Sequence, residues 1–407
     1  MTDTVDSGRD SAFRVLGQRT FATYFAGNFL SNCGTWFQNI AQAILVYRLT
    51  HSSLIVGVTN FSQFAGIIVL APWAGRAADR FDRRFLIIVT QVVSVVITGT
   101  LAVLAGFGRA SVPVVIALAL LLGIANAFVI PALKALVPSL VPARDLHAAL
   151  TMDSATFNVS RAIGPVLGAL VVAKAGIPWA FAVNCLSYTA LVVAIVVIGP
   201  QPQARRDGVA LRLRDTIGMV RRDRTLAVLF GVVMAVALTA DPPNTLGPAF
   251  ATTIFHRSDS FTGIIVGAFG VGATLAALTA VGRHADPYRW ILWMLGAAGL
   301  GLIGFATAGS YGVGLVGLIL CGYGYLAAQT SATTLIVLRV DDRERGRIMA
   351  LWSVAFLGTR PLASLTEGAL AGPFGPRVAA GVIVVPIVVV AVALVLLNRV
   401  GDSVPAP

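Results

Sequence analysis

Long stretches without a charged residue alternate along this chain with short charged segments. The stretches free of Asp, Glu, Lys and Arg are 20–47, 49–75, 85–108, 110–133, 175–204, 260–282, 290–338 and 378–398. A membrane core of about 30 Å is crossed by about 20 apolar residues in a helix. The stretch 290–338 is too long for one crossing, and the Gly-Ser-Tyr-Gly sequence at 309–312 predicts a turn inside it. The pattern therefore predicts nine uncharged membrane-spanning helices.

Three further segments have the length of a span but contain charged residues. They are about 148–172 with Asp153 and Arg161, about 225–250 with Asp241, and about 349–371 with Arg360 and Glu367. They raise the predicted number of spans to twelve. A soluble, all-helical core is the alternative, but it requires polar helix faces that the uncharged stretches lack.

The two halves of the chain repeat one another. The sequence GRAAD at 75–79 aligns with GRHAD at 282–286, and Arg161 aligns with Arg360. A polar linker at 200–223 separates the halves. We therefore expect an N-terminal six-helix bundle at 20–199 and a C-terminal six-helix bundle at 224–399, in the same orientation, as in transporters built from parallel repeats.

Charge sets the expected orientation in the membrane. The net charge is +12, and 23 of the 30 Lys and Arg residues lie in segments on the side of the N-terminus, against 5 in the opposite loops. Because cytoplasmic loops carry such an excess, the tails 1–19 and 400–407 and the linker should be cytoplasmic, in a multi-pass protein of the plasma or inner membrane. The first 19 residues contain six charged residues and no apolar segment, so we expect no cleaved signal peptide. The basic charge thus indicates topology and not a nucleic-acid partner.

The charged loop GRAADRFDRR at 75–84 carries a family resemblance. It resembles the loop signature Gly-x-Leu-Ala-Asp-Arg-x-Gly-Arg-Arg of the major facilitator superfamily, with departures at Ala77 and Asp82. The residues that match are Gly75, Ala78, Asp79, Arg80, Arg83 and Arg84. An Asp at the second departure, the stretch GNFLSNCGTWFQ at 27–38 and the run NVSRAIGPVLGAL at 158–170 resemble its enterobactin-exporter and macrolide-efflux-like branch. The run at 158–170 is similar to an antiporter signature through Gly164, Pro165 and Gly168, although Ser160 and Ala169 stand where glycine is typical.

The resemblance implies an all-α membrane protein with twelve transmembrane helices in two pseudo-symmetric six-helix bundles. It also implies a cytoplasmic latch, in which Asp79 faces the start of span 11 and Asp286 faces span 5. In the second half, Gly282 and Arg283 belong to the loop that contains Asp286. Physically, a glycine permits close helix approach, a carboxylate suits a helix N-terminus, and the arginines can bind lipid phosphates or carboxylates of the other half. A basic loop that only sets topology is the alternative.

Charged residues inside spans are expensive near the bilayer centre and mark candidate sites. Asp241 begins the sequence DPPN in a span whose three prolines must break the helix, so it is our first candidate for a protonatable coupling group or, alternatively, a helix cap. Arg161 and Arg360 lie at mid-depth. They are expected to pair with a carboxylate or helix carbonyls and tie the two halves together, to bind an anionic or carbonyl-rich substrate, or to do both. Asp153 and Glu367 lie nearer span ends and are further candidates for a coupling or substrate role, with the alternative that each simply reaches water. Amides in the first span can line a cavity or bond between helices.

Other chemistries lack their residues. The two lysines, Lys134 and Lys174, stand outside any P-loop sequence, and the three cysteines and four histidines form no metal or disulfide spacing. We therefore expect no enzyme, no metal and no cofactor beyond a proton gradient. The sequence predicts a secondary active transporter that exports an amphipathic small molecule (a drug, siderophore or secondary metabolite) by proton antiport, as a monomer in the lipid bilayer. The alternatives are an importer of the same fold and a non-transporting receptor or membrane enzyme.

Overall fold

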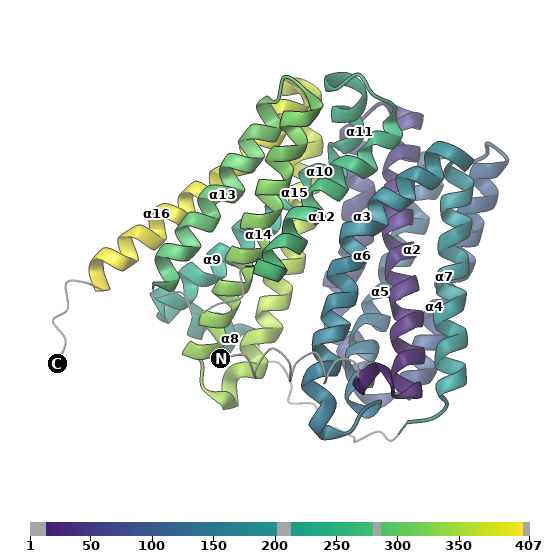
Figure 1. Ribbon diagram of the computed structural model, residues 1–407, viewed down its shortest axis with the longest axis horizontal. Coiled ribbons are helices and arrows are strands. Elements are labelled where there is room, and N and C mark those ends of the chain that lie inside the picture. The colour runs from purple at the N-terminus through teal and green to yellow at the C-terminus, as the bar shows by residue number, and fades with distance from the viewer. Residues whose placement is uncertain (1–13, 202–212, 280–285, 402–407) are drawn as a thin grey trace. The chain divides into compact units, whose positions relative to one another are not determined.

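The computed structural model describes residues 14–201, 213–279 and 286–401, and within these ranges the chain is helical without a β-strand (Figure 1). The chain divides into two compact units. The first consists of Met1–Leu45 and Ala65–Val209, and the second of Val46–Phe64 and Ala210–Pro407. The hairpin 46–64 thus belongs to the second unit although it lies early in the sequence.

The first unit is built on six long helices, two of which continue into the hairpin 46–64. They are α2 (Arg19–Thr50), α3 (Ser53–Arg80), α4 (Arg83–Gly106), α5 (Val112–Leu136), α6 (Leu146–Ala175) and α7 (Ile177–Ile198). Two short 3₁₀ helices, Val137–Ser139 and Ala143–Asp145, join α5 to α6. Proline stands in the first turn of α5 and of α7, where its missing N–H has no intrahelical partner to lose. Gly176, at a φ of 96°, ends α6.

The second unit begins with the amphipathic helix α8 (Leu213–Arg222) and contains one span that is broken into short pieces. These pieces are α9 (Arg224–Thr239), α10 (Pro242–Thr245), α11 (Gly247–Ala249) and a π-helical turn at Phe250–Ile254. After the 3₁₀ turn Asp259–Phe261 follow α12 (Thr262–Thr279), α13 (Pro287–Thr307), α14 (Tyr311–Arg339), α15 (Asp342–Val382) and α16 (Val384–Gly401).

Ten helical segments of the described chain are long and apolar enough to cross a membrane, against the twelve expected. Two features account for the difference. The first span, α2, is not among the ten, and it contains five amides in its sequence. Residues 347–397 form one continuous candidate segment, although Gly375 at φ 81° interrupts the helical backbone inside it.

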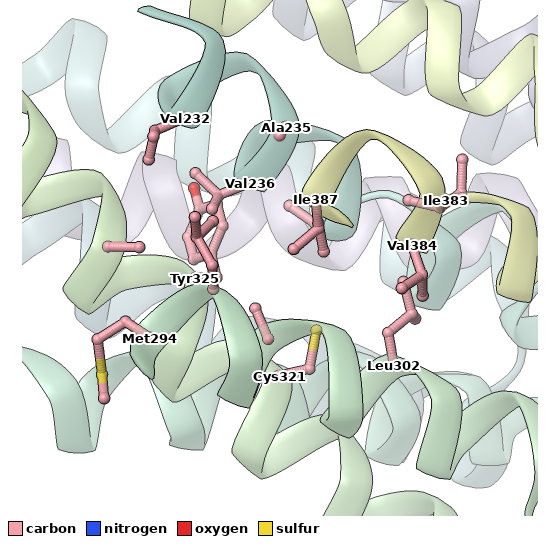
Figure 2. Close-up of a cluster of buried hydrophobic side chains, with 14 of the residues drawn as sticks. Val232, Ala235, Val236, Met294, Leu302, Cys321, Tyr325, Ile383, Val384 and Ile387 are labelled. Atoms are coloured by element: carbon pink, nitrogen blue, oxygen red, sulfur yellow. The ribbon is translucent and has the colours of Figure 1, made fainter. Parts of the chain in front are cut away.

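Small residues bring helices of the second unit into close contact. A Cβ added to Gly301 of α13 would lie 2.4 Å from the backbone nitrogen of Cys321 in α14, and one on Gly272 of α12 would lie 1.9 Å from the carbonyl oxygen of Ile319. Glycine therefore lets these helices touch through their backbones, which suits helices that cannot rely on the hydrophobic effect inside a membrane. Figure 2 shows part of the buried apolar cluster of this unit, including Val236 of α9 and Cys321 and Tyr325 of α14.

Candidate functional site

The break in the seventh predicted span places a carboxylate in the interior of the second unit. α9 ends at Thr239 and α10 starts at Pro242, as the prolines predict, because proline removes a backbone donor and clashes with the preceding turn. Asp241 between them is 1 % exposed. Its Oδ2 accepts a hydrogen bond from Thr245 Oγ1 at 2.8 Å, and Asn60 Nδ2 of α3 donates to the same Thr245 oxygen at 3.1 Å.

The side chain of Asp241 makes no capping hydrogen bond to α10. Its backbone carbonyl instead accepts from the amides of Asn244, at 2.8 Å, and Thr245, at 3.0 Å. Asn244 Nδ2 donates to the carbonyl of Ala240 at 2.9 Å, which satisfies an acceptor at the broken end of α9. The structure therefore does not support the alternative that the Asp241 carboxylate is a helix cap, and its role in coupling stays a prediction.

Glu367 is fully buried, so the alternative that it simply reaches water is wrong, and its role in coupling stays a prediction. The reason is the packing of α15 against the hairpin 46–64. A Cβ on Gly368 would lie 2.8 Å from Leu54 Cα, and one on Gly57 would lie 2.2 Å from the carbonyl oxygen of Ser364. Neither carboxylate oxygen of Glu367 has a hydrogen-bond partner among the described residues. Glu367 also interacts electrostatically with Asp241, so two buried carboxyl groups share one neighbourhood.

The two mid-span arginines are both buried to 6 % exposure, and each lies against an aromatic ring. Arg161 Cζ is 5.8 Å from the ring centre of Trp36, and Arg360 Cζ is 5.0 Å from that of Phe64. Such a contact stabilises a desolvated cation by about 2 kcal/mol. The sequence indicates carboxylates, carbonyls and substrate as partners of these arginines, and the structure adds aromatic residues of α2 and α3 to their surroundings.

Asp153 is also buried, at 4 % exposure, so the alternative that it simply reaches water is wrong as well. It accepts hydrogen bonds from Tyr24 Oη at 2.9 Å, from Asn28 Nδ2 at 3.1 Å and from Lys134 Nζ at 2.5 Å. Lys134 was missed as a site residue, although it is the only charged residue within α5. The spacing of Tyr24 and Asn28, one helical turn apart on α2, was the other available signal.

The glycines of the antiporter-like run form a packing surface between α6 and α2. A Cβ on Gly164 would lie 2.6 Å from Trp36 Cβ, and one on Gly168 would lie 2.9 Å from Phe37 Cα. Pro165 lies inside α6 between them. This surface holds Trp36 beside Arg161, one turn earlier on α6. Polar bonds between helices also occur in this unit, since Gln38 Oε1 of α2 accepts from Thr98 at 2.9 Å and Asn184 at 2.6 Å.

Two arginines of the loop 75–84 bind helix ends of their own unit. Arg83 Nη1 donates to the carbonyl of Ala135 at 2.8 Å, and Arg84 donates to the carbonyls of Ile195 and Val196, both at 3.1 Å. These carbonyls end α5 and α7, where unpaired acceptors and the negative end of the helix dipole favour a cation. No described atom lies within 4 Å of a Cβ built on Gly75, so close helix approach does not explain this glycine.

The structure describes the side chains of Asp82 and Asp286 in the two loops but not that of Asp79. Asp82 begins α4 and accepts from the amide of Phe85 at 2.8 Å, and Asp286 begins α13 and accepts from the amide of Arg289 at 2.9 Å. Asp286 therefore matches Asp82 in its capping role, although the sequences align it with Asp79. Asp79 and Arg80 lie in the last turn of α3. The Asp79 side chain, together with Gly282 and Arg283, lies outside the described part of the chain, so the latch stays a prediction.

The chain is similar to known membrane proteins over most of its length. The family model "Transmembrane secretion effector" matches residues 10–403. The staphyloferrin A transporter of Staphylococcus aureus is 24 % identical over 86 % of this chain and 89 % of its own length. The enterobactin exporter EntS of Citrobacter koseri is 25 % identical over 93 % of this chain and 91 % of its own length.

Solved transporters share the fold. The nucleoside transporter NupG superposes with a TM-score of 0.74 at 15 % identity, over 94 % of this chain and 99 % of its own. A bacterial homologue of the human lysosomal transporter Spinster superposes with a TM-score of 0.75 at 14 % identity, over 95 % and 98 %. These matches confirm the all-α fold class of the major facilitator transporters.

Proposed function

The chain belongs to the transmembrane secretion effector family of major facilitator transporters, and we propose that it exports an amphipathic small molecule in exchange for protons. It is a multi-pass membrane protein with a transporter fold. Export, proton coupling and the chemical class of the substrate form the proposal. In such a cycle the two halves expose a central site alternately to the two sides of the membrane.

The observation that carries proton coupling is the buried carboxylate of Asp241 at a helix break. Proton coupling requires an acidic site that binds a proton when it is enclosed and releases it when it faces water, and Asp241 contributes a buried carboxyl group to such a site. Irregular backbone at membrane depth is tolerated where it is buried in protein or lines a cavity. A movement of the short helix α10, which starts after the break at 240–241, would therefore change the surroundings of Asp241.

The proposed substrate class follows from the charged and aromatic residues. Arg161 with Trp36, and Arg360 with Phe64, each present a cation beside an aromatic surface. Such pairs suit a molecule that combines aromatic rings with anionic or carbonyl oxygens. The names of the relatives, a staphyloferrin A transporter and an enterobactin exporter, support a siderophore-like substrate over a simple apolar drug.

The test is flux in proteoliposomes with an imposed pH gradient, using a panel of siderophores and antibiotics. We expect a substrate to move against its gradient when protons flow in the opposite direction, and we expect Asp241→Asn to abolish this movement. Asp341→Asn is the matched control, because Asp341 is exposed and makes no capping hydrogen bond. Wild-type pumping in Asp241→Asn would remove this residue from the coupling mechanism.

Importation is the second candidate, and the sign of the same measurement separates it from export. If protons and substrate move in the same direction, the fold supports an importer. We further propose that one copy of the chain in a lipid bilayer suffices. Reconstitution at one chain per vesicle would retain flux if so.

A further inference from the structure

We propose that Glu367 and Asp241 together form one proton-binding site, in which Glu367 carries the proton while Asp241 keeps its negative charge. This inference rests on the proposed function for its place in transport, because a bound proton matters there only if protons drive the cycle. The protonation state itself is a property of the folded chain and is testable without any substrate.

Glu367 is the member that needs the proton. Its side chain is fully buried, and neither of its oxygens has a hydrogen-bond donor among the described residues. An ionised carboxyl group without donors in such a place is far more costly than a neutral one, so the group takes up a proton. The close packing of α15 on the hairpin at Gly57 and Gly368 accounts for this burial.

Asp241 has the environment that favours the charged form. Thr245 Oγ1 donates a hydrogen bond to Oδ2 of Asp241 at 2.8 Å. Asn60 Nδ2 donates to the same Thr245 oxygen, so the Thr245 hydroxyl is free to direct its own hydrogen at Asp241. Hydrogen bonds to the charged form of a carboxylate stabilise that form. Since the charges of Asp241 and Glu367 act on each other, two negative charges here would repel, and one proton relieves the repulsion.

Few other charges surround the pair. The helices packed on α15 include α8, α9, α10, α13 and α16. Of these, α8 is the charged helix, with Arg214, Asp215, Arg221 and Arg222, and it precedes α9 in the chain. α10 has no charged residue, and α9, α13 and α16 each carry one at or near an end, at Arg224, Arg289 and Arg399 respectively. The hairpin residues 53–64 are uncharged. On α15 itself, Arg360 stands seven residues before Glu367, about 10 Å along the axis, with its guanidinium over Phe64. Arg377 stands ten residues after Glu367 and donates to the carbonyl of Ala306 at 3.1 Å.

The chemical step is a simple protonation. A proton from water forms an O–H bond with one oxygen of Glu367, and the site changes from two negative charges to one. On release this O–H bond breaks, and the proton passes to water on the other side of the membrane. No other group needs to gain or lose a proton.

The experiment is infrared spectroscopy of the purified full chain in lipid nanodiscs at neutral pH, in H₂O and in D₂O. We expect a C=O band of a protonated carboxylic acid that shifts on deuteration. It should disappear in Glu367→Gln, persist in Asp241→Asn and be unchanged in Glu344→Gln, the matched control on the same helix. Glu367→Asp, which keeps a carboxyl group, should retain a displaced band and covers the case in which Glu367→Gln fails to fold.

A wild-type protein without this band, or a band that survives in folded Glu367→Gln, overturns the proposal. A band that sodium ions remove, with potassium as control, would show a metal cation site and also overturns it. The proposed function fails separately. If the band is present but a pH gradient drives no flux of any substrate in the wild type, the proton site stands while proton-driven export falls.

Discussion

Lys134→Met should destabilise the first unit because it leaves a buried carboxylate without its cation. The side chain of Asp153 is 3 % exposed while that of Lys134 is 60 % exposed. Breaking a fully buried pair by removing one partner costs about 3–5 kcal/mol, and an exposed pair contributes about 0–1 kcal/mol. Asp153 is buried whereas Lys134 is exposed, and Tyr24 and Asn28 still donate hydrogen bonds to Asp153 in the variant. We therefore expect the free energy of unfolding to fall by about 2 kcal/mol, between these two ranges.

The opposite substitution should cost less. Asp153→Asn keeps an oxygen that accepts from Tyr24, and the exposed Lys134 ammonium turns to water, so we expect a loss of about 1 kcal/mol, the value of one ordinary hydrogen bond. The double variant should lose less than the sum of the single variants, because residues in one network are not additive.

The assay is chemical unfolding in mixed detergent micelles, followed by the helical circular dichroism signal. Lys174→Met is the matched control, since Lys174 is the only other lysine and is exposed near the end of α6. Equal losses for the two lysine variants, or strict additivity in the double variant, would refute this reasoning.

Three further outcomes follow from the geometry. Arg161→Lys should fold but lose most transport, because lysine keeps the charge yet lacks the planar fork; normal flux per folded protein would make Arg161 a structural residue. Burial opposes ionisation of Asp223, but hydrogen bonds from Arg339 and from the amides of Leu226 and Thr225 outweigh it and hold its pKa below the usual value. The ionised Asp223 therefore stabilises the protein fully above the unfolded pKa of about 3.9, and this stabilisation is lost as the pH falls through the lower folded pKa. Asp223→Asn should remove this pH dependence from the free energy of unfolding. A variant with the same pH dependence as the wild type would contradict the prediction. Gly272→Ala should lower the thermal unfolding temperature, since overpacking costs about 1–3 kcal/mol. Gly296→Ala should not, because among the described residues no atom beyond its own helical turn lies within 4 Å of its added Cβ. Equal unfolding temperatures would contradict the close contact of α12 and α14.

The helices and the helix break were predictable from the sequence, whereas the surroundings of the charged residues were not. Uncharged length identifies a span, and the prolines after Asp241 identify its break. Hydropathy does not tell which face of a span meets protein, because lipid and protein interior are both apolar. Depth along the span alone therefore leaves open whether Glu367 and Asp153 reach water or lie in the protein interior, and the structure buries both.

Contacts between distant segments were the other limit. Lys134 and Tyr24 reach Asp153 from α5 and α2, and Asn60 reaches Thr245 across 185 residues. No local spacing encodes such pairs. The helix caps at Asp82 and Asp286 are predictable from the sequence, because Asp directly before a helical run commonly starts a helix.

The central claim is that this chain exchanges protons for substrate. It is tested most directly by trapping a pH-sensitive dye inside proteoliposomes and adding a transported substrate on one side without an imposed gradient. The account predicts that substrate entering the vesicle drives proton exit and raises the internal pH, and that Asp241→Asn and Glu367→Gln abolish this change. Substrate movement in the wild type without any change of internal pH would contradict the account.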